Sequence, residues 1–257
     1  MKVPSNPLIK VYVAASLVII PLIAAAFFTP PDFPMLLRQV LLCVWGVGAT
    51  LVAERLLFSR SWGQAWQRVG FVRVRRSMGL VALLVSLPMW LFLPLLAWLQ
   101  DTPIQLQSDG WALLVGVILV NGITEEVIHR GFVFGHLRQE RPFWPAAMLS
   151  ALLFAGQHLY LIFILGWISG LASVLLAALL AFPLAYSYAH GCNSLGGPAL
   201  LHTSSNAPMI ILALPPTLLA TALLPYMGVV LVSIYLVFIL DRFPARPEVN
   251  RWAGSKY

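Results

Sequence analysis

The stretch WALLVGVILVNGITEEVIHRGFVFG, residues 111–135, is the most informative part of the sequence. It is apolar almost throughout, yet it places the adjacent acids Glu125 and Glu126 near its centre, with His129 and Arg130 about one helical turn further on. Bringing an ionisable side chain to membrane depth costs about 2.5–3.5 kcal/mol on insertion scales. Such residues in an apolar run therefore indicate a functional site inside a membrane-spanning helix.

The composition of the whole chain supports a membrane protein. Of the 257 residues, 60% are hydrophobic and 10% are charged, and the mean hydropathy is +0.87. A soluble core could not bury this much apolar surface. Because one span needs about 20 apolar residues, we predict an all-α, polytopic helical bundle forming a single membrane domain over residues 1–257. Its eight expected transmembrane helices cover residues 8–29, 35–57, 77–99, 111–133, 147–165, 168–188, 196–213 and 217–240.

The positions of the basic residues predict the orientation. With eight spans, 14 of the 16 Lys and Arg residues fall at one membrane face, whereas the segments around Pro30–Pro34 and Asp101–Ser108 contain none. Short loops rich in Lys and Arg stay on the cytoplasmic side, so we expect both termini to be cytoplasmic. These 14 residues are Lys2, Lys10, Arg55, Arg60, Arg68, Arg73, Arg75, Arg76, Arg138, Arg141, Arg242, Arg246, Arg251 and Lys256.

The net charge of +7 follows from this topology and predicts anionic lipid headgroups as partners. Nucleic acid is not an expected partner, because no nucleic-acid-binding fold surrounds the arginines. The two cysteines, Cys43 and Cys192, fall in a span and in a loop, so we expect free thiols. A catalytic Cys192 beside His190 is an alternative to an ordinary loop cysteine.

Polar residues inside the spans are expected to face the bundle interior together. Positions four apart share one face of a helix, so Asn121, Glu125 and His129 form one stripe while Glu126 and Arg130 form a second. We expect Glu126 and Arg130 to be a structural ion pair and His129 to be a neighbour of Glu125. Two other spans carry the remaining candidates, which are Phe154 and His158 in one and His202, Ser205 and Asn206 in the other.

The depths of these residues are compatible with one site. Glu125 and His158 are equidistant from the turn at Arg141 and Pro142, and His202 lies about seven residues, or on the order of 10 Å, inside its span. We therefore expect a pocket in the cytoplasmic half of the bilayer that opens toward the cell interior.

Three motifs in order resemble a known family. Residues 125–130 fit EExxxR, residues 154–158 fit FxxxH, and residues 202–206 fit HxxxN. Each motif is weak alone, but all three on three spans resemble the CAAX prenyl protease and bacteriocin-processing family of intramembrane endopeptidases, also called the Abi family. The resemblance places a catalytic core at residues 110–215. Gly197-Pro198 replaces the Trp-Pro that is usual in this family.

The resemblance implies a peptidase in which a glutamate and a histidine activate water. Carried over to this sequence, it makes Glu125 the general base and His158 its partner, while His202 and Asn206 stabilise the oxyanion. Glu126 and Arg130 would support the helix. The expected substrate is a membrane-associated peptide or protein, which can be lipidated, and the expected location is a bacterial inner (plasma) membrane.

Alternatives remain open from sequence alone. Zinc could bind Glu125, His158 and His202, with His129 as a further ligand, although the usual HExxH spacing is absent and we expect no cofactor. A proton-coupled transporter could also use an intramembrane glutamate. A non-catalytic scaffold or immunity protein is the third alternative.

Overall fold

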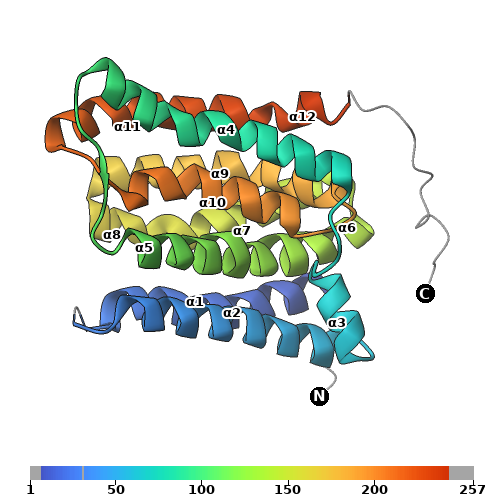
Figure 1. The fold of residues 1–257 in the computed structure, drawn as a ribbon. Helices are drawn as coiled ribbons and strands as arrows, with labels where there is room; N and C mark the ends of the chain where they lie inside the picture. Colours follow the sequence, from blue (N-terminus) through green and yellow to red (C-terminus); the bar gives the residue numbers. More distant parts are fainter. Residues whose placement is uncertain (1–6, 31, 243–257) are drawn as a thin grey trace.

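A computed structural model describes residues 7–30 and 32–242 and places them in a bundle of helices (Figure 1). Lys2, Arg246, Arg251 and Lys256, which entered the orientation argument, lie outside the described residues. The regular elements are helical apart from two strands of two residues each, so the predicted all-α class is confirmed. The first half of the described chain consists of α1 (Pro7–Phe28), α2 (Met35–Leu57), α3 (Trp62–Arg68), α4 (Arg76–Leu99), β1 (Gln105–Leu106), α5 (Gly110–Val117), η1 (Ile118–Glu125), η2 (Val127–Phe134) and α6 (Gly135–Glu140).

The second half of the described chain begins with an α-helix that continues into a short 3₁₀ turn. It consists of α7 (Phe143–Gln157), the 3₁₀ turn η3 (His158–Tyr160), α8 (Leu161–Leu165), α9 (Trp167–His190), α10 (Gly196–Ile211), β2 (Leu212–Ala213), α11 (Pro216–Tyr235) and α12 (Val237–Leu240). The predicted boundary between the spans at 147–165 and 168–188 is confirmed at Gly166, which separates α8 from α9. Its φ of +79° is a left-handed backbone conformation that glycine adopts without a side-chain penalty.

Seven helical segments in the described part of the chain are long and apolar enough to cross a membrane. The protein is therefore an integral, multi-pass membrane protein. Two predicted spans were too short, because the fourth extends over Gly110–Glu140 and the fifth begins at Phe143. The predicted span at 196–213 corresponds to α10, whose 16 residues fall short of a full apolar span. The total of eight crossings therefore stays a prediction.

The bundle has two distinct ends. At one end Leu195, just before α10, donates its backbone N–H to the carbonyl of Gly70, and α3 and α6 lie at this end in Figure 1. Arg75 and Asp241 also form an ion pair here, which joins the start of α4 to the end of α12. At the other end β1 pairs antiparallel with β2. The end that carries Arg68, Arg75 and Arg138 is called the Arg-rich end below. The described chain begins and finishes there (Figure 1). That the Arg-rich end faces the cytoplasm stays a prediction.

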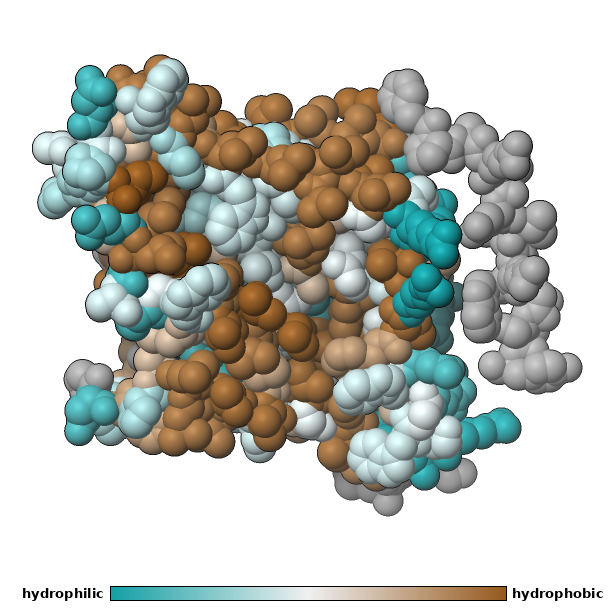
Figure 2. Space-filling view, in the orientation of Figure 1, coloured by the Kyte–Doolittle hydropathy of each residue, from teal (hydrophilic) through white to brown (hydrophobic). Residues whose placement is uncertain are grey.

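The flank between these ends is apolar. Figure 2 shows hydrophobic residues over much of this flank and hydrophilic residues gathered toward the two ends. Large side chains such as Leu17, Leu91 and Ile168 are exposed along the helices. This distribution matches the hydrocarbon and headgroup zones of a bilayer.

The motif-bearing helix is not a regular α-helix. Residues 118–125 and 127–134 form the wider π-helices η1 and η2, and the Thr124 hydroxyl donates to the carbonyl of Leu119 five residues earlier. Such π segments occur often at functional sites. The sequence analysis assumed α-helical spacing, which does not describe this stretch.

Small residues hold this helix close to its neighbours. A Cβ atom on Gly46 of α2 would collide with the side chain of Thr124, and one on Gly122 would collide with Thr203 of α10. Helices in membranes approach closely where glycine removes the side chain. Residues 122–124 are therefore fixed between α2 and α10, which places the following two glutamates.

Candidate active site

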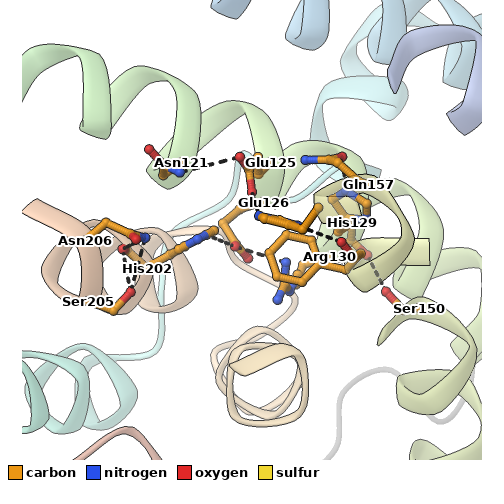
Figure 3. A network of polar contacts seen from close by, with 12 residues as sticks. Asn121, Glu125, Glu126, His129, Arg130, Ser150, Gln157, His202, Ser205 and Asn206 are labelled. Carbon is orange, nitrogen blue, oxygen red and sulfur yellow. Dashed lines mark hydrogen bonds and ion pairs between the residues drawn. The ribbon is translucent and has the colours of Figure 1, made fainter. Parts of the chain in front are cut away.

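The two adjacent glutamates point to different surroundings, as predicted. Figure 3 shows them at the centre of a polar network, between His202, Ser205 and Asn206 on one side and His129, Gln157 and Ser150 on the other. Glu125 is 7% exposed and lines a cavity, whereas Glu126 is fully buried. The two carboxyl groups therefore have separate chemical roles.

Glu125 has one carboxylate oxygen near Asn121 and one near His158. Asn121 Nδ2 lies 3.5 Å from Glu125 Oε1, and His158 Nε2 lies 3.9 Å from Glu125 Oε2. Glu125 Oε2 is buried and has no hydrogen-bond partner within the described residues. Since 3.9 Å is too long for a hydrogen bond, the carboxylate and the imidazole face each other across a gap.

The backbone fixes the orientation of His158. Its Nδ1 atom lies 2.7 Å from the carbonyl oxygen of Phe154, at the point where α7 ends and the 3₁₀ turn begins. A carbonyl can only accept a hydrogen bond, so Nδ1 carries the proton. In the neutral ring, the Nε2 atom that faces Glu125 is therefore a hydrogen-bond acceptor.

Glu126 connects two helices as well as pairing within its own. Its Oε1 atom lies 3.1 Å from Arg130 NH1 and 2.7 Å from Nδ1 of His202 on α10. The expected pair with Arg130 is present, but it is only part of a buried triad. Because a carboxylate accepts the hydrogen bond, His202 donates from Nδ1 and its Nε2 atom remains for another contact.

Asn206 lies on the same helix as His202 and is oriented by it. Its Nδ2 atom donates to the carbonyl of His202 at 3.1 Å and lies 3.4 Å from the Ser205 hydroxyl oxygen. Ser205 also donates to the His202 carbonyl. The amide is thus held at the His202 turn of α10.

Phe154, which the sequence analysis named together with His158, lies at the centre of the site. Its ring centroid is 4.7 Å from that of His158 and 5.7 Å from that of His202, both edge to face. The guanidinium carbon of Arg130 is 4.2 Å from the same centroid, and such a contact adds a cation–π attraction. One aromatic ring therefore spaces the two histidines of the motifs.

Gln157 is a residue of the site that the sequence analysis missed. Its Oε1 atom lies 2.7 Å from Nε2 of His129, and Gln157 lines the cavity beside Glu125. His129 therefore faces α7, where its hydrogen bond goes to Gln157. That His129 is a neighbour of Glu125 stays a prediction. A polar residue directly before His158 in an apolar helix was the available signal.

The cavity beside Glu125 has a volume of about 250 Å³ and lies on the side away from the Arg-rich end. Its lining comes from α1, α2, α5, η1, η3 and the ends of α7 and α10, and includes Leu22, Arg38, Leu113, Asn121, Gln157, Tyr160 and Ile210. Of the four predicted catalytic residues, Glu125 is the one that lines it. The expectation of a pocket opening toward the Arg-rich end was wrong for this cavity, because hydropathy alone carries no information about where side chains leave space.

The alternative sites have different geometry. Within residues 7–30 and 32–242, no group of three or more His, Cys, Asp or Glu side chains could hold a metal ion. His158 faces Glu125, whereas His202 bonds Glu126. The two histidines proposed as zinc ligands therefore contact different glutamates. Cys43 and Cys192 are free thiols, and His190 contacts Asp241 rather than supporting Cys192.

Comparison with known families supports the resemblance. Residues 107–208 match the family model described as type II CAAX prenyl endopeptidase Rce1-like. This segment is similar to that family. It includes EExxxR, FxxxH and HxxxN, and the described family is one of peptidases, so the match points to an intramembrane endopeptidase. The search of curated proteins found no match to the chain.

Proposed function

We propose that this protein is an intramembrane endopeptidase that hydrolyses a membrane-associated peptide with water activated by Glu125 and His158. The observation that carries the proposal is the 3.9 Å gap between Glu125 Oε2 and His158 Nε2, together with the absence of a hydrogen-bond partner for that buried oxygen among the described residues. Two acceptors facing one point suit a water molecule, which has two protons to donate.

The arrangement supports a specific first step. A water hydrogen-bonded to both groups directs one proton to Glu125 and the other to His158 Nε2, so its lone pair is free to attack the peptide carbonyl carbon. Glu125 takes up the proton as the C–O bond forms and acts as the general base. The tautomer of His158 matters here, because the Phe154 carbonyl keeps Nε2 available as an acceptor.

The second step needs donors for the negative oxygen of the tetrahedral intermediate. We assign this role to His202 and Asn206, which lie on one helix and are held by Glu126 and by the backbone. His202 donates Nδ1–H to Glu126, so donation from its Nε2 atom requires the imidazolium form of the ring. One donor of this kind is worth about 3–4 kcal/mol in acyl transfer.

Breakdown of the intermediate returns the site to its starting state. The C–N bond breaks, the leaving nitrogen takes the proton from Glu125, and a carboxylic acid and an amine are released, which exchange the remaining water proton to become a carboxylate and an ammonium group. Each Glu125 proton is thus taken from water and delivered to the amine. No cofactor enters this proposed cycle.

The surroundings indicate the kind of substrate. The site lies among membrane-spanning segments, which favours a membrane-associated peptide or protein, with or without a lipid anchor, in a bacterial inner membrane. The basic end would contact anionic headgroups.

The test compares cells and proteoliposomes carrying the native chain with Glu125→Gln and Glu125→Ala variants. Membrane peptides that disappear only with the variants, at equal protein levels, would identify both substrate and chemistry. Glu140→Gln is a matched control, because Glu140 is exposed at the end of α6. Unchanged peptide termini combined with loss of ion-coupled flux would instead support a transporter, and unchanged peptide binding without any cleavage would support a scaffold.

A further inference from the structure

A second charged side chain lines the cavity beside Glu125. Arg38, in the first turns of α2, lines the same cavity as Glu125. Arg38 and Arg130 are the two basic residues outside the predicted cytoplasmic segments, and Arg130 is paired with Glu126. Arg38 is therefore a cation that the membrane topology does not explain.

Arg38 has no anionic partner in the described part of the chain. No acid within residues 7–30 and 32–242 forms a salt bridge with it. Its Nε atom is buried and lacks a hydrogen-bond partner, although the residue as a whole is half-buried. A buried donor left unpaired loses its hydrogen bonds to water without replacement, and this penalty is larger when the group is charged. Such a cost at a cavity wall is consistent with a group that pairs when a ligand binds.

Arg38 and Glu125 line the cavity from backbone positions that lie about two helical turns apart in depth. Gly46 of α2 packs against Thr124, next to Glu125, and Arg38 precedes Gly46 by eight residues, which is about 12 Å along a helix. Apolar side chains line the space between them, including Leu42, Val117 and Val120. An extended peptide covers about 12 Å in roughly four residues. A peptide bound in the cavity can therefore place the cleaved bond at Glu125 and a group a few residues away at Arg38.

We propose that Arg38 is a specificity residue that binds a carboxylate of the substrate, a few residues from the cleaved bond. This inference rests on the proposed peptidase function of the same site. A guanidinium group matches a carboxylate through two parallel hydrogen bonds. The carboxylate can belong to the chain end of the peptide or to an Asp or Glu side chain, because the same recognition applies to both.

The probe is a membrane-anchored peptide library presented to the full-length protein in liposomes of neutral lipid. Each peptide is made with a free C-terminal acid and as the C-terminal amide, and Asp or Glu is exchanged for Asn or Gln in the five positions on either side of the cut. Cleavage is measured with the native chain, and binding is measured with Glu125→Gln, so that recognition is observed without turnover.

We expect the native chain to prefer one carboxylate-bearing form by about ten- to a hundredfold in kcat/KM, the range for a hydrogen bond to a charged group. Arg38→Gln should remove this preference mainly through KM, and Arg38→Lys should retain part of it. Arg38→Glu should favour peptides with Lys at the same position. Arg60→Gln removes the same charge from an exposed loop and should preserve the preference.

Three results distinguish the two proposals. Cleavage of acid and neutral peptides at equal rates, or an equal loss of both with Arg38→Gln, would overturn the role of Arg38 and leave the peptidase function standing. Carboxylate-dependent binding that requires Arg38, without cleavage of any bound peptide, would support the role of Arg38 and contradict the peptidase function. Failure of every peptide in both binding and cleavage would overturn both proposals.

Discussion

His202 Nδ1 lies 2.7 Å from Glu126 Oε1, and this contact joins the EExxxR helix to the HxxxN helix. Glu126 also contacts Arg130, so one buried carboxylate holds two nitrogen groups from different positions in the chain. The second glutamate of the motif therefore orients a histidine on another helix, in addition to bracing its own. This geometry gives Glu126 a positioning role that a pair within one helix would not have.

The buried ion pair leads to the first prediction. Arg130→Met should destabilise the folded protein by about 3–5 kcal/mol, because it leaves the carboxylate of Glu126 with less compensation in a buried site. The double variant Glu126→Gln/Arg130→Met should recover part of this loss, since no uncompensated charge remains. Unfolding in mixed detergent micelles measures both. Arg141→Gln is the control: Arg141 is half-buried, but its ion-pair partner Glu140 is exposed, so the change in stability should be less than about 1 kcal/mol. A double variant no more stable than Arg130→Met would contradict the ion-pair account.

The oxyanion assignment leads to the second prediction. Asn206→Ala should lower kcat by about 10²–10³-fold with little change in KM, because the donor acts on charge that develops only in the transition state. Ser205→Ala is the matched control on the same turn, since its hydroxyl donates to the His202 carbonyl. Steady-state cleavage of the identified peptide gives both constants. An equal effect of the two substitutions would show that the turn, rather than the amide, is needed.

Phe154 leads to the third prediction. Phe154→Ala should destabilise the protein by about 3–5 kcal/mol, since it removes a fully buried ring that contacts His158, His202 and Arg130. Phe154→Leu should be more stable than the alanine variant but should still lose activity, because the two histidines lose the ring that spaces them. Activity per folded molecule separates these effects. Full activity of the leucine variant would indicate that Phe154 only fills volume.

The proposed chemistry without a cofactor leads to the fourth prediction. Thorough treatment of the purified protein with chelators should leave peptide cleavage unchanged, because the proposed nucleophile is water activated by Glu125 and His158. Metal content and activity should be measured on the same sample. Loss of activity that zinc restores would reverse this assignment and favour a metal-bound hydroxide.

Hydropathy and motif order predicted much of this architecture. The apolar runs located the spans, including the boundary between residues 165 and 168. In the structure, Gly166 has a positive φ at this boundary, a conformation that suits glycine. The separation of Glu125 from Glu126 also followed from their adjacent positions, since neighbouring residues on a helix point in different directions.

Other features depended on information that a single sequence does not provide. The hydrogen bond between His129 and Gln157 joins η2 to α7, and spacing along one helix does not predict it. The fourth span was underestimated because His136 and Arg138 resemble a loop, although the helix continues to Glu140. The cavity between Arg38 and Glu125 arises from the packing of several helices, which spacing along one helix does not predict.

The short pairing of β1 with β2 has a consequence for how α10 fits a bilayer. Sixteen helical residues extend about 24 Å, which is less than the ~30 Å hydrocarbon thickness. The two extended residues that follow, Leu212 and Ala213, add about 7 Å. Extended backbone would leave polar groups unpaired in lipid, but Gln105 and Leu106 pair with them, and Gln107 donates to the carbonyls of Ile210 and Ile211. The helix that carries His202 and Asn206, α10, can thereby reach the membrane surface opposite the Arg-rich end without exposing unpaired peptide groups to the lipid tails.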